Sequence, residues 1–125
     1  MDKRIVYSAI LALYVLLMIV LALTPSFGFL NPLVSANDKT LHFAEFFVLT
    51  IIVLLTVRTW GFERKYIVTV VACVLVLVAS EQVQRLISTR SFDYLDMLAD
   101  FTGILLAVLV DKVANMVRKW QSSSR

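Results

Sequence analysis

The sequence predicts an all-α integral membrane protein, a bundle of four transmembrane helices that forms a single domain over residues 1–125. Of the 125 residues, 60% are hydrophobic and only 17% are charged, whereas soluble globular domains carry about 25% charged residues. The mean hydropathy is positive, at +0.86. Four apolar stretches approach the length that a helix needs to cross the ~30 Å hydrocarbon core of a bilayer. Helices are expected because an open strand would leave backbone groups unpaired in lipid.

The first two stretches differ in their polarity. Ile5 to Leu23 contains no charged residue, and as a helix it covers ~28 Å. Its apolar run exceeds the ~7–15 residues of a signal-peptide core, so we expect a retained membrane helix. The second stretch, Leu41 to Val57, is interrupted near its start by His42 and Glu45.

The last two stretches also carry polar residues at one end. Tyr66 to Ile87 becomes polar only in its final turns, and Phe92 to Val110 contains three aspartates. A polar tail from Arg118 to Arg125 follows, which we expect to fray.

Lysine and arginine predict the orientation, because cytoplasmic loops of membrane proteins are enriched in them. With a cytoplasmic N-terminus, nine basic residues lie inside: Lys3, Arg4, Arg58, Arg64, Lys65, Lys112, Arg118, Lys119 and Arg125. Only Lys39, Arg85 and Arg90 lie outside. We therefore predict a multi-pass plasma-membrane protein with both termini cytoplasmic.

Two other classes of protein are disfavoured. A net charge of +3 with dispersed basic residues does not indicate a nucleic-acid binder. The single cysteine, Cys73, excludes an intramolecular disulfide and is interpreted as a small buried hydrophobe.

The predicted topology gathers polar residues from three helices near the outer leaflet. The outer acids are Asp38, Glu45, Glu81, Asp93, Asp96 and Asp100, and the one histidine, His42, is outer too. Helical spacing of three or four residues places Asp38, His42 and Glu45 on one face. Gly103 continues the face of Asp96 and Asp100, where another helix could approach closely.

Insertion energetics favour bringing these faces together. A carboxylate at a helix centre costs roughly 2.5–3.5 kcal/mol on insertion scales. Asp100 lies ~12 Å along its helix from Phe92, so it is the acid least able to reach water and the strongest functional candidate. Asp38 and Asp93 have an equal claim to be helix N-caps. Glu81 with Arg85 has the simpler interpretation of an i,i+4 pair, and His42 that of an interfacial residue.

The predicted site is divided by role. The catalytic candidates are His42, Asp96 and Asp100. The ligand-binding candidates are Asp38, Lys39, Glu45, Glu81, Gln84, Arg85, Arg90 and Asp93. A divalent cation held by carboxylate oxygens is a candidate cofactor, and Asp96 and Asp100 are the candidates for the metal-binding or base role.

Three segments, DKTLHFAEFFVL, SEQVQRLI and TRSFDYLDMLADFTG, together resemble the VanZ-like family of small membrane proteins. The family has Asp-Lys-x-x-His-Phe opening one helix and Glu-x-x-Gln ending the next. On the last helix it has Arg followed by Asp-x-x-Asp-x-x-x-Asn-x-x-Gly. The resemblance covers about residues 37–110. The matching positions are Asp38, Lys39, His42, Phe43, Glu81, Gln84, Arg90, Asp93, Asp96 and Gly103.

One position departs from the family pattern: Asp100 stands where the family has asparagine, which adds a titratable group. The resemblance implies a membrane location and an envelope-related role, since the founding member is linked to resistance to the glycopeptide teicoplanin. It does not imply a particular reaction.

Three functions remain open. The protein either acts on a lipid-linked or phosphorylated envelope ligand, with His42 transferring protons and Arg90 contacting phosphate, or it is a non-catalytic binding or accessory protein. Transport is less favoured, because four helices barely enclose a path and the predicted charge cluster lies on one side only. A homo-oligomer would make transport more plausible.

Overall fold

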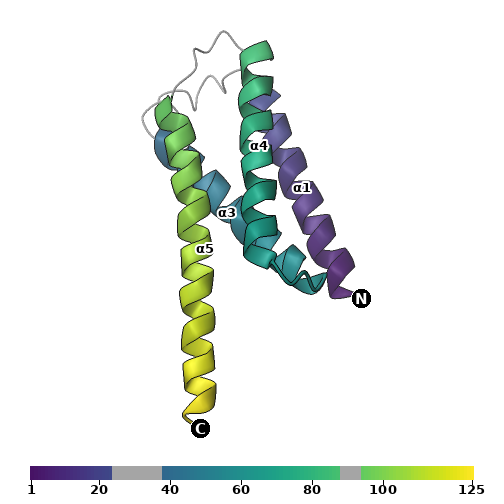
Figure 1. Cartoon of the computed structure of the whole chain (residues 1–125). Coiled ribbons are helices and arrows are strands. Elements are labelled where there is room, and N and C mark those ends of the chain that lie inside the picture. The colour runs from purple at the N-terminus through teal and green to yellow at the C-terminus, as the bar shows by residue number, and fades with distance from the viewer. Residues whose placement is uncertain (24–37, 88–93) are drawn as a thin grey trace.

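The computed structural model describes residues 1–23, 38–87 and 94–125 and contains four α-helices. They are α1 (Lys3–Leu23), α3 (Asp38–Thr59), α4 (Lys65–Ile87) and α5 (Tyr94–Ser123). Successive helices run in opposite directions, and the two termini lie toward the same end of the molecule (Figure 1). The predicted all-α class and the four predicted helices are therefore confirmed. We call the end near the termini the termini end and the other the site end.

Helix α3 is the central element. It contacts α1, α4 and α5, whereas among the described residues α1 and α5 do not contact each other. Figure 1 shows α3 lying obliquely between α5 on one side and the pair of α1 and α4 on the other. The buried core accordingly follows α3, which contributes Phe46, Leu49, Val53 and Val57.

Helix ends follow local sequence signals. The Asp2 carboxylate accepts a hydrogen bond of 3.0 Å from the Arg4 N–H, which caps α1. After α3, Gly61 adopts a positive φ of 76°. The Gly61 N–H donates to the Arg58 carbonyl and the Phe62 N–H to the Val57 carbonyl, which is the Schellman pattern that ends a helix.

Gly103 permits the close approach of α5 to α3. A Cβ atom built on Gly103 would lie 2.5 Å from the Phe43 carbonyl oxygen and 3.1 Å from the Phe47 nitrogen. Both are backbone atoms, so neither could move aside cheaply. Gly103 and Ala107 belong to the buried face of α5, together with Asp100 and Ile104, as the predicted stripe required.

Helix α5 extends further than expected. The prediction ended the fourth helix at Val110 and frayed the tail from Arg118, but the helix continues to Ser123. The reason is compositional: from residue 104 onward the chain has no glycine or proline, and its Ala, Met, Lys, Arg and Gln residues favour helix. At ~1.5 Å per residue its 30 residues measure ~45 Å. Figure 1 shows α5 projecting past the other helices at the termini end.

Three helices, α1, α3 and α4, are long and apolar enough to cross a membrane. This indicates a multi-pass membrane protein. Helix α5 differs because Asp96, Asp100 and Asp111 interrupt its apolar part, which raises the cost of placing it in lipid.

Candidate functional site

The site is centred on a buried pair between α3 and α5. His42 Nδ1 lies 3.0 Å from Asp100 Oδ1. His42 is 8% exposed and Asp100 is fully buried, so the pair lies in a medium of low dielectric constant, where the mutual attraction of opposite charges is strong. Asp100 therefore faces the bundle interior and contacts the one histidine of the chain.

A second layer of the site lies one helical turn nearer the site end. His42 Nε2 is 3.9 Å from Asp96 Oδ2, and the Lys39 ammonium is 3.3 Å from Asp96 Oδ1. Lys39 precedes His42 by three residues and Asp96 precedes Asp100 by four, so each pair shares a helix face. The result is a chain of contacts from exposed Lys39 through Asp96 and His42 to buried Asp100.

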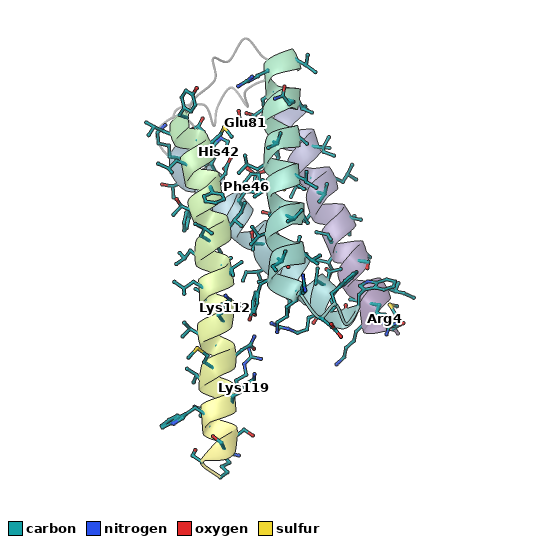
Figure 2. All side chains as sticks on the ribbon, in the orientation of Figure 1. Arg4, His42, Phe46, Glu81, Lys112 and Lys119 are labelled. Carbon is teal, nitrogen blue, oxygen red and sulfur yellow. The ribbon has the colours of Figure 1, made fainter. Side chains whose placement is uncertain are left out.

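Two glutamates flank this chain. Glu45, one turn after His42, interacts electrostatically with His42 and Asp100. Glu81, buried near the end of α4, interacts with the same two residues and with Asp96. Figure 2 shows His42 and Glu81 close to each other at the site end. Three helices thus bring four carboxylates to one imidazole.

Helix α1 supports the site through its backbone contact. The Tyr14 hydroxyl donates a 2.8 Å hydrogen bond to the Glu45 carbonyl oxygen. This bond ties α1 to α3 beside the site.

The geometry around His42 is suited to proton transfer. A neutral imidazole that donates its Nδ1–H to Asp100 presents Nε2 as an acceptor. Nε2 points toward the more accessible Asp96 side, and the 3.9 Å separation is too long for a direct hydrogen bond. A water or a ligand hydroxyl there could pass a proton to Nε2, and Asp100 would stabilise the imidazolium that forms.

The other predicted site residues have different outcomes. Arg85 interacts electrostatically with Glu81, in accord with the simpler interpretation of that pair, and Gln84 on the same turn is half-buried. The side chain of Asp38 and all of Arg90 and Asp93 lie outside the described residues. Their predicted roles stay predictions.

The described residues contain no group of three or more His, Cys, Asp or Glu side chains arranged to hold a metal ion.

A second polar cluster lies at the termini end and was missed by sequence reasoning. Arg58 Nη2 on α3 lies 2.8 Å from both carboxylate oxygens of Asp111 on α5. The Tyr66 hydroxyl on α4 donates to Asp111 Oδ2 at 2.9 Å, and the Asn115 amide donates to both Asp111 and Tyr66 at 3.1 Å. We call these four residues the clamp, because they tie three helices together.

A sequence signal for the clamp existed. Asp111 is the only acid between Asp100 and the end of the chain, and Arg58 is the last charged residue of α3 before the turn. An acid and a base on facing antiparallel helices at the same depth predict an ion pair, and Asn115 follows Asp111 by four residues. This signal is easily missed, because the charges near the helix ends are also the ones that predict the membrane orientation.

Apolar side chains separate the two clusters. Leu49, Leu54, Ile104 and Ala107 are all about 1% exposed or less. This filled interior disfavours a polar path from one end to the other. Thr50 and Thr69 are also buried in this interior, and the two polar clusters lie at opposite ends of the bundle.

Comparison with known proteins adds one relative. No protein-family model matches this chain, and no solved structure matches it. It is similar to the uncharacterized protein C11E3.10 of Schizosaccharomyces pombe, with 35% identity over 108 residues. The match covers 82% of this chain and 62% of the yeast protein, so the chain spans less than two thirds of that relative's length.

Proposed function

We propose that this protein is a four-span membrane protein of the VanZ-like type whose site-end cluster binds a lipid-linked polar ligand and transfers a proton through His42. The observation that carries the proposal is the buried contact between His42 and Asp100, 3.0 Å long, with Asp96 on the accessible side. Burying a carboxylate such as that of Asp100 costs several kcal/mol in desolvation unless it is hydrogen-bonded or paired. A merely structural role does not require both an imidazole and four carboxylates here.

The fourth span is the apolar part of α5. Its two acids within the span face the bundle, where they contact α3. The exposed side of this part is apolar: Leu95, Leu98, Phe101, Leu105 and Leu109. Such a helix presents hydrocarbon to lipid and its carboxylates to the other helices, as expected for ionisable residues in a membrane.

The site end faces outward in this proposal. Both termini lie at the opposite end (Figure 1), together with Arg58, Arg64 and Lys65 near the α3–α4 turn. Since basic loops stay in the cytoplasm, the cluster around His42 opens toward the exterior leaflet. A ligand anchored in that leaflet reaches it by lateral diffusion.

The excess of carboxylates in the cluster favours a ligand that carries other polar groups besides a phosphate. Glu45, Glu81, Asp96 and Asp100 outnumber the basic side chains Lys39 and Arg85 among the described residues. A bare phosphate would be repelled by this excess of carboxylates. A headgroup that combines a phosphate, near Lys39, with hydroxyl or amino groups, near the carboxylates, fits better.

The proton step then has a simple course. A ligand hydroxyl or a water between Asp96 and His42 gives its proton to Nε2, and its oxygen becomes the nucleophile. For a phosphate ester, that oxygen forms the new bond to phosphorus while the leaving oxygen departs with the electron pair of the broken bond. His42 returns the proton afterwards.

The test uses the full-length protein in nanodiscs that contain a polyisoprenyl phosphate sugar, a polyisoprenyl diphosphate sugar or phosphatidylethanolamine, whose headgroups all combine phosphate with hydroxyl or amino groups. Native mass spectrometry measures bound lipid, and product analysis measures turnover. We expect wild type to retain one of these lipids and His42→Asn to keep binding but lose turnover. Glu63→Gln, which removes an exposed acid at the termini end, is the control and should match wild type.

The non-catalytic alternative predicts a different result. A binder would show no turnover in wild type and lower retention in Asp96→Ala. If wild type retains none of the three lipids above its bulk fraction, the proposed ligand class is wrong.

A further inference from the structure

The helical extension of α5 beyond the bundle has an exposed apolar stripe. Val113, Met116, Val117 and Trp120 all lie on its surface, and Trp120 is 72% exposed. Their spacing of i, i+3, i+4 and i+7 places them on one face of the helix. An apolar face that leaves the bundle requires something to cover it.

The same extension is strongly basic. Residues 112–125 contain Lys112, Arg118, Lys119 and Arg125 and no acid. Figure 2 shows Lys112 and Lys119 on this part of α5, and their separation of seven residues places them on one face. Basic residues beside an apolar stripe with tryptophan are the pattern of a helix that lies at a membrane surface.

A pair of lysines meets at the base of the extension. The ammonium groups of Lys65 on α4 and Lys112 on α5 lie 5.1 and 5.0 Å from the centroid of one ring, that of Tyr66. Within the part of the chain that the structure describes, neither ammonium lies in an ion pair. Lys65 also interacts electrostatically with Asp111, but Arg58 already pairs with that carboxylate. The two lysines therefore leave an excess of positive charge, which favours an anion.

We propose that Lys65, Lys112 and the α5 extension form a binding surface for anionic phospholipid headgroups in the leaflet at the termini end. The surface rests on the proposed fourth span but not on the ligand of the His42 cluster. Measured from Tyr94, a helix perpendicular to the membrane leaves the ~30 Å hydrocarbon core after about 20 residues. Lys112 and Val113 then lie at the boundary of the core, and Met116, Val117, Arg118, Lys119 and Trp120 follow within ~9 Å of it. Basic residues at this depth are attracted to anionic lipid.

A second copy of the chain is the other candidate occupant. It is less suitable because parallel copies would bring four positive charges on each extension together with no acid to offset them. Anionic headgroups, by contrast, complement the charge and leave the stripe against the acyl boundary. The charge pattern therefore selects lipid.

The first test measures lipid preference. Full-length protein in nanodiscs of phosphatidylcholine and phosphatidylglycerol is released into the mass spectrometer and its retained lipids are counted. We expect wild type to be enriched severalfold in phosphatidylglycerol and Lys65→Gln/Lys112→Gln to lose at least half of that enrichment. The control Lys3→Gln/Arg4→Gln also removes two positive charges at the termini end, but from α1. It should keep the enrichment in phosphatidylglycerol. Equal retention in wild type and Lys65→Gln/Lys112→Gln would overturn the proposal.

The second test locates the stripe and needs no change to the surface. Trp60→Phe leaves Trp120 as the only tryptophan, and lipids brominated near the glycerol should quench its fluorescence more strongly in anionic than in neutral nanodiscs. If Trp120 were not quenched and Ser122→Cys formed a disulfide between two copies of the chain, the stripe would be covered by a second copy instead. A tryptophan at Leu105, in a Trp-free background, reports the fourth span separately. Deep quenching there without quenching of Trp120 would overturn only the lipid surface.

Discussion

At the scale of single residues, Asp100 is the most constrained side chain. It is fully buried and contacts His42, and removing one partner of a buried pair costs roughly 3–5 kcal/mol. We therefore expect Asp100→Ala to lower the melting temperature in detergent markedly. Asp100→Asn keeps the size and an oxygen acceptor for His42 Nδ1, so it should lose much less.

The control for this comparison is Asp96→Ala, one turn away. The Asp96 side chain is 16% exposed and its His42 contact is longer, at 3.9 Å, so its loss should cost less than that of Asp100. Thermal unfolding monitored by circular dichroism ranks the three variants. Equal destabilisation by Asp100→Asn and Asp100→Ala would mean that the charge of Asp100, not its packing and hydrogen bond, stabilises the fold.

Asp111 allows a prediction about pH, because it lies beyond the apolar part of α5. Burial alone would raise the pKa of Asp111, but hydrogen bonds from Arg58 and Tyr66 and the charges of Arg58 and Lys65 hold it below its usual range. A carboxyl whose pKa is lower in the folded state stabilises the fold fully above its unfolded pKa, ~3.9. That stabilisation is lost as the pH falls through the folded pKa.

The expected signature is a difference that depends on pH. Wild type should melt at a higher temperature than Asp111→Asn by a constant margin from pH 8 to about 5, and the margin should shrink below about pH 4. Melting curves of both proteins across this range supply the measurement. A margin that grows on acidification would show that the clamp does not hold Asp111 in its charged form.

At the scale of elements, the packing of α3 on α5 depends on Gly103. A methyl group there would overlap the Phe43 carbonyl oxygen, so Gly103→Ala must push the helices apart and stretch the contact between His42 and Asp100. Gly61 is the matched control: its φ is positive, yet nothing lies within 4 Å of an added Cβ. Gly61→Ala should therefore cost only backbone strain, ~1–2 kcal/mol.

The two substitutions separate packing from conformation. We expect both to lower the melting temperature, but only Gly103→Ala to lower ligand retention at the site end. Retention is measured by the same mass spectrometry that defines the ligand. Unchanged retention in Gly103→Ala would show that α5 does not need this close approach to present Asp96 and Asp100.

Sequence reasoning was most successful where spacing alone decides the outcome. Asp100, Gly103 and Ala107 share a helix face by periodicity, and the structure buries all three. It was less successful where the answer depends on which helices face each other. The contact of Tyr14 with the Glu45 carbonyl and the clamp at Asp111 join residues 31 to 53 positions apart. Local spacing does not encode such pairings, and the signal for the clamp can be used only once α3 and α5 are known to face each other.

The end of α5 shows a different limit. Apolar content locates the part of a helix that meets lipid, but it does not locate the end of the helix. Lys112 to Ser123 mixes basic and polar residues with apolar ones, yet it favours helix by intrinsic propensity. The apolar stripe of Val113, Met116, Val117 and Trp120 becomes visible only once the segment is known to be helical.

At the scale of the whole molecule, the arrangement of the four helices predicts on which side of the membrane each end lies. The two termini and the turn between α3 and α4 share one end (Figure 1), and Thr40 lies in the first turn of α3, at the other end. In a Cys73→Ala background, single cysteines at Gly61, Ser124 and Thr40 are exposed positions suited to labelling in intact cells. Because basic residues cluster with the first two, we expect an impermeant maleimide to label Thr40→Cys from outside. It should label Gly61→Cys and Ser124→Cys only after permeabilisation.

If Gly61→Cys and Ser124→Cys were labelled from opposite sides, α4 and α5 would not both cross, and the fourth span would be wrong. If both were labelled from outside and Thr40→Cys only after permeabilisation, the four spans would stand but the His42 cluster would open to the cytoplasm.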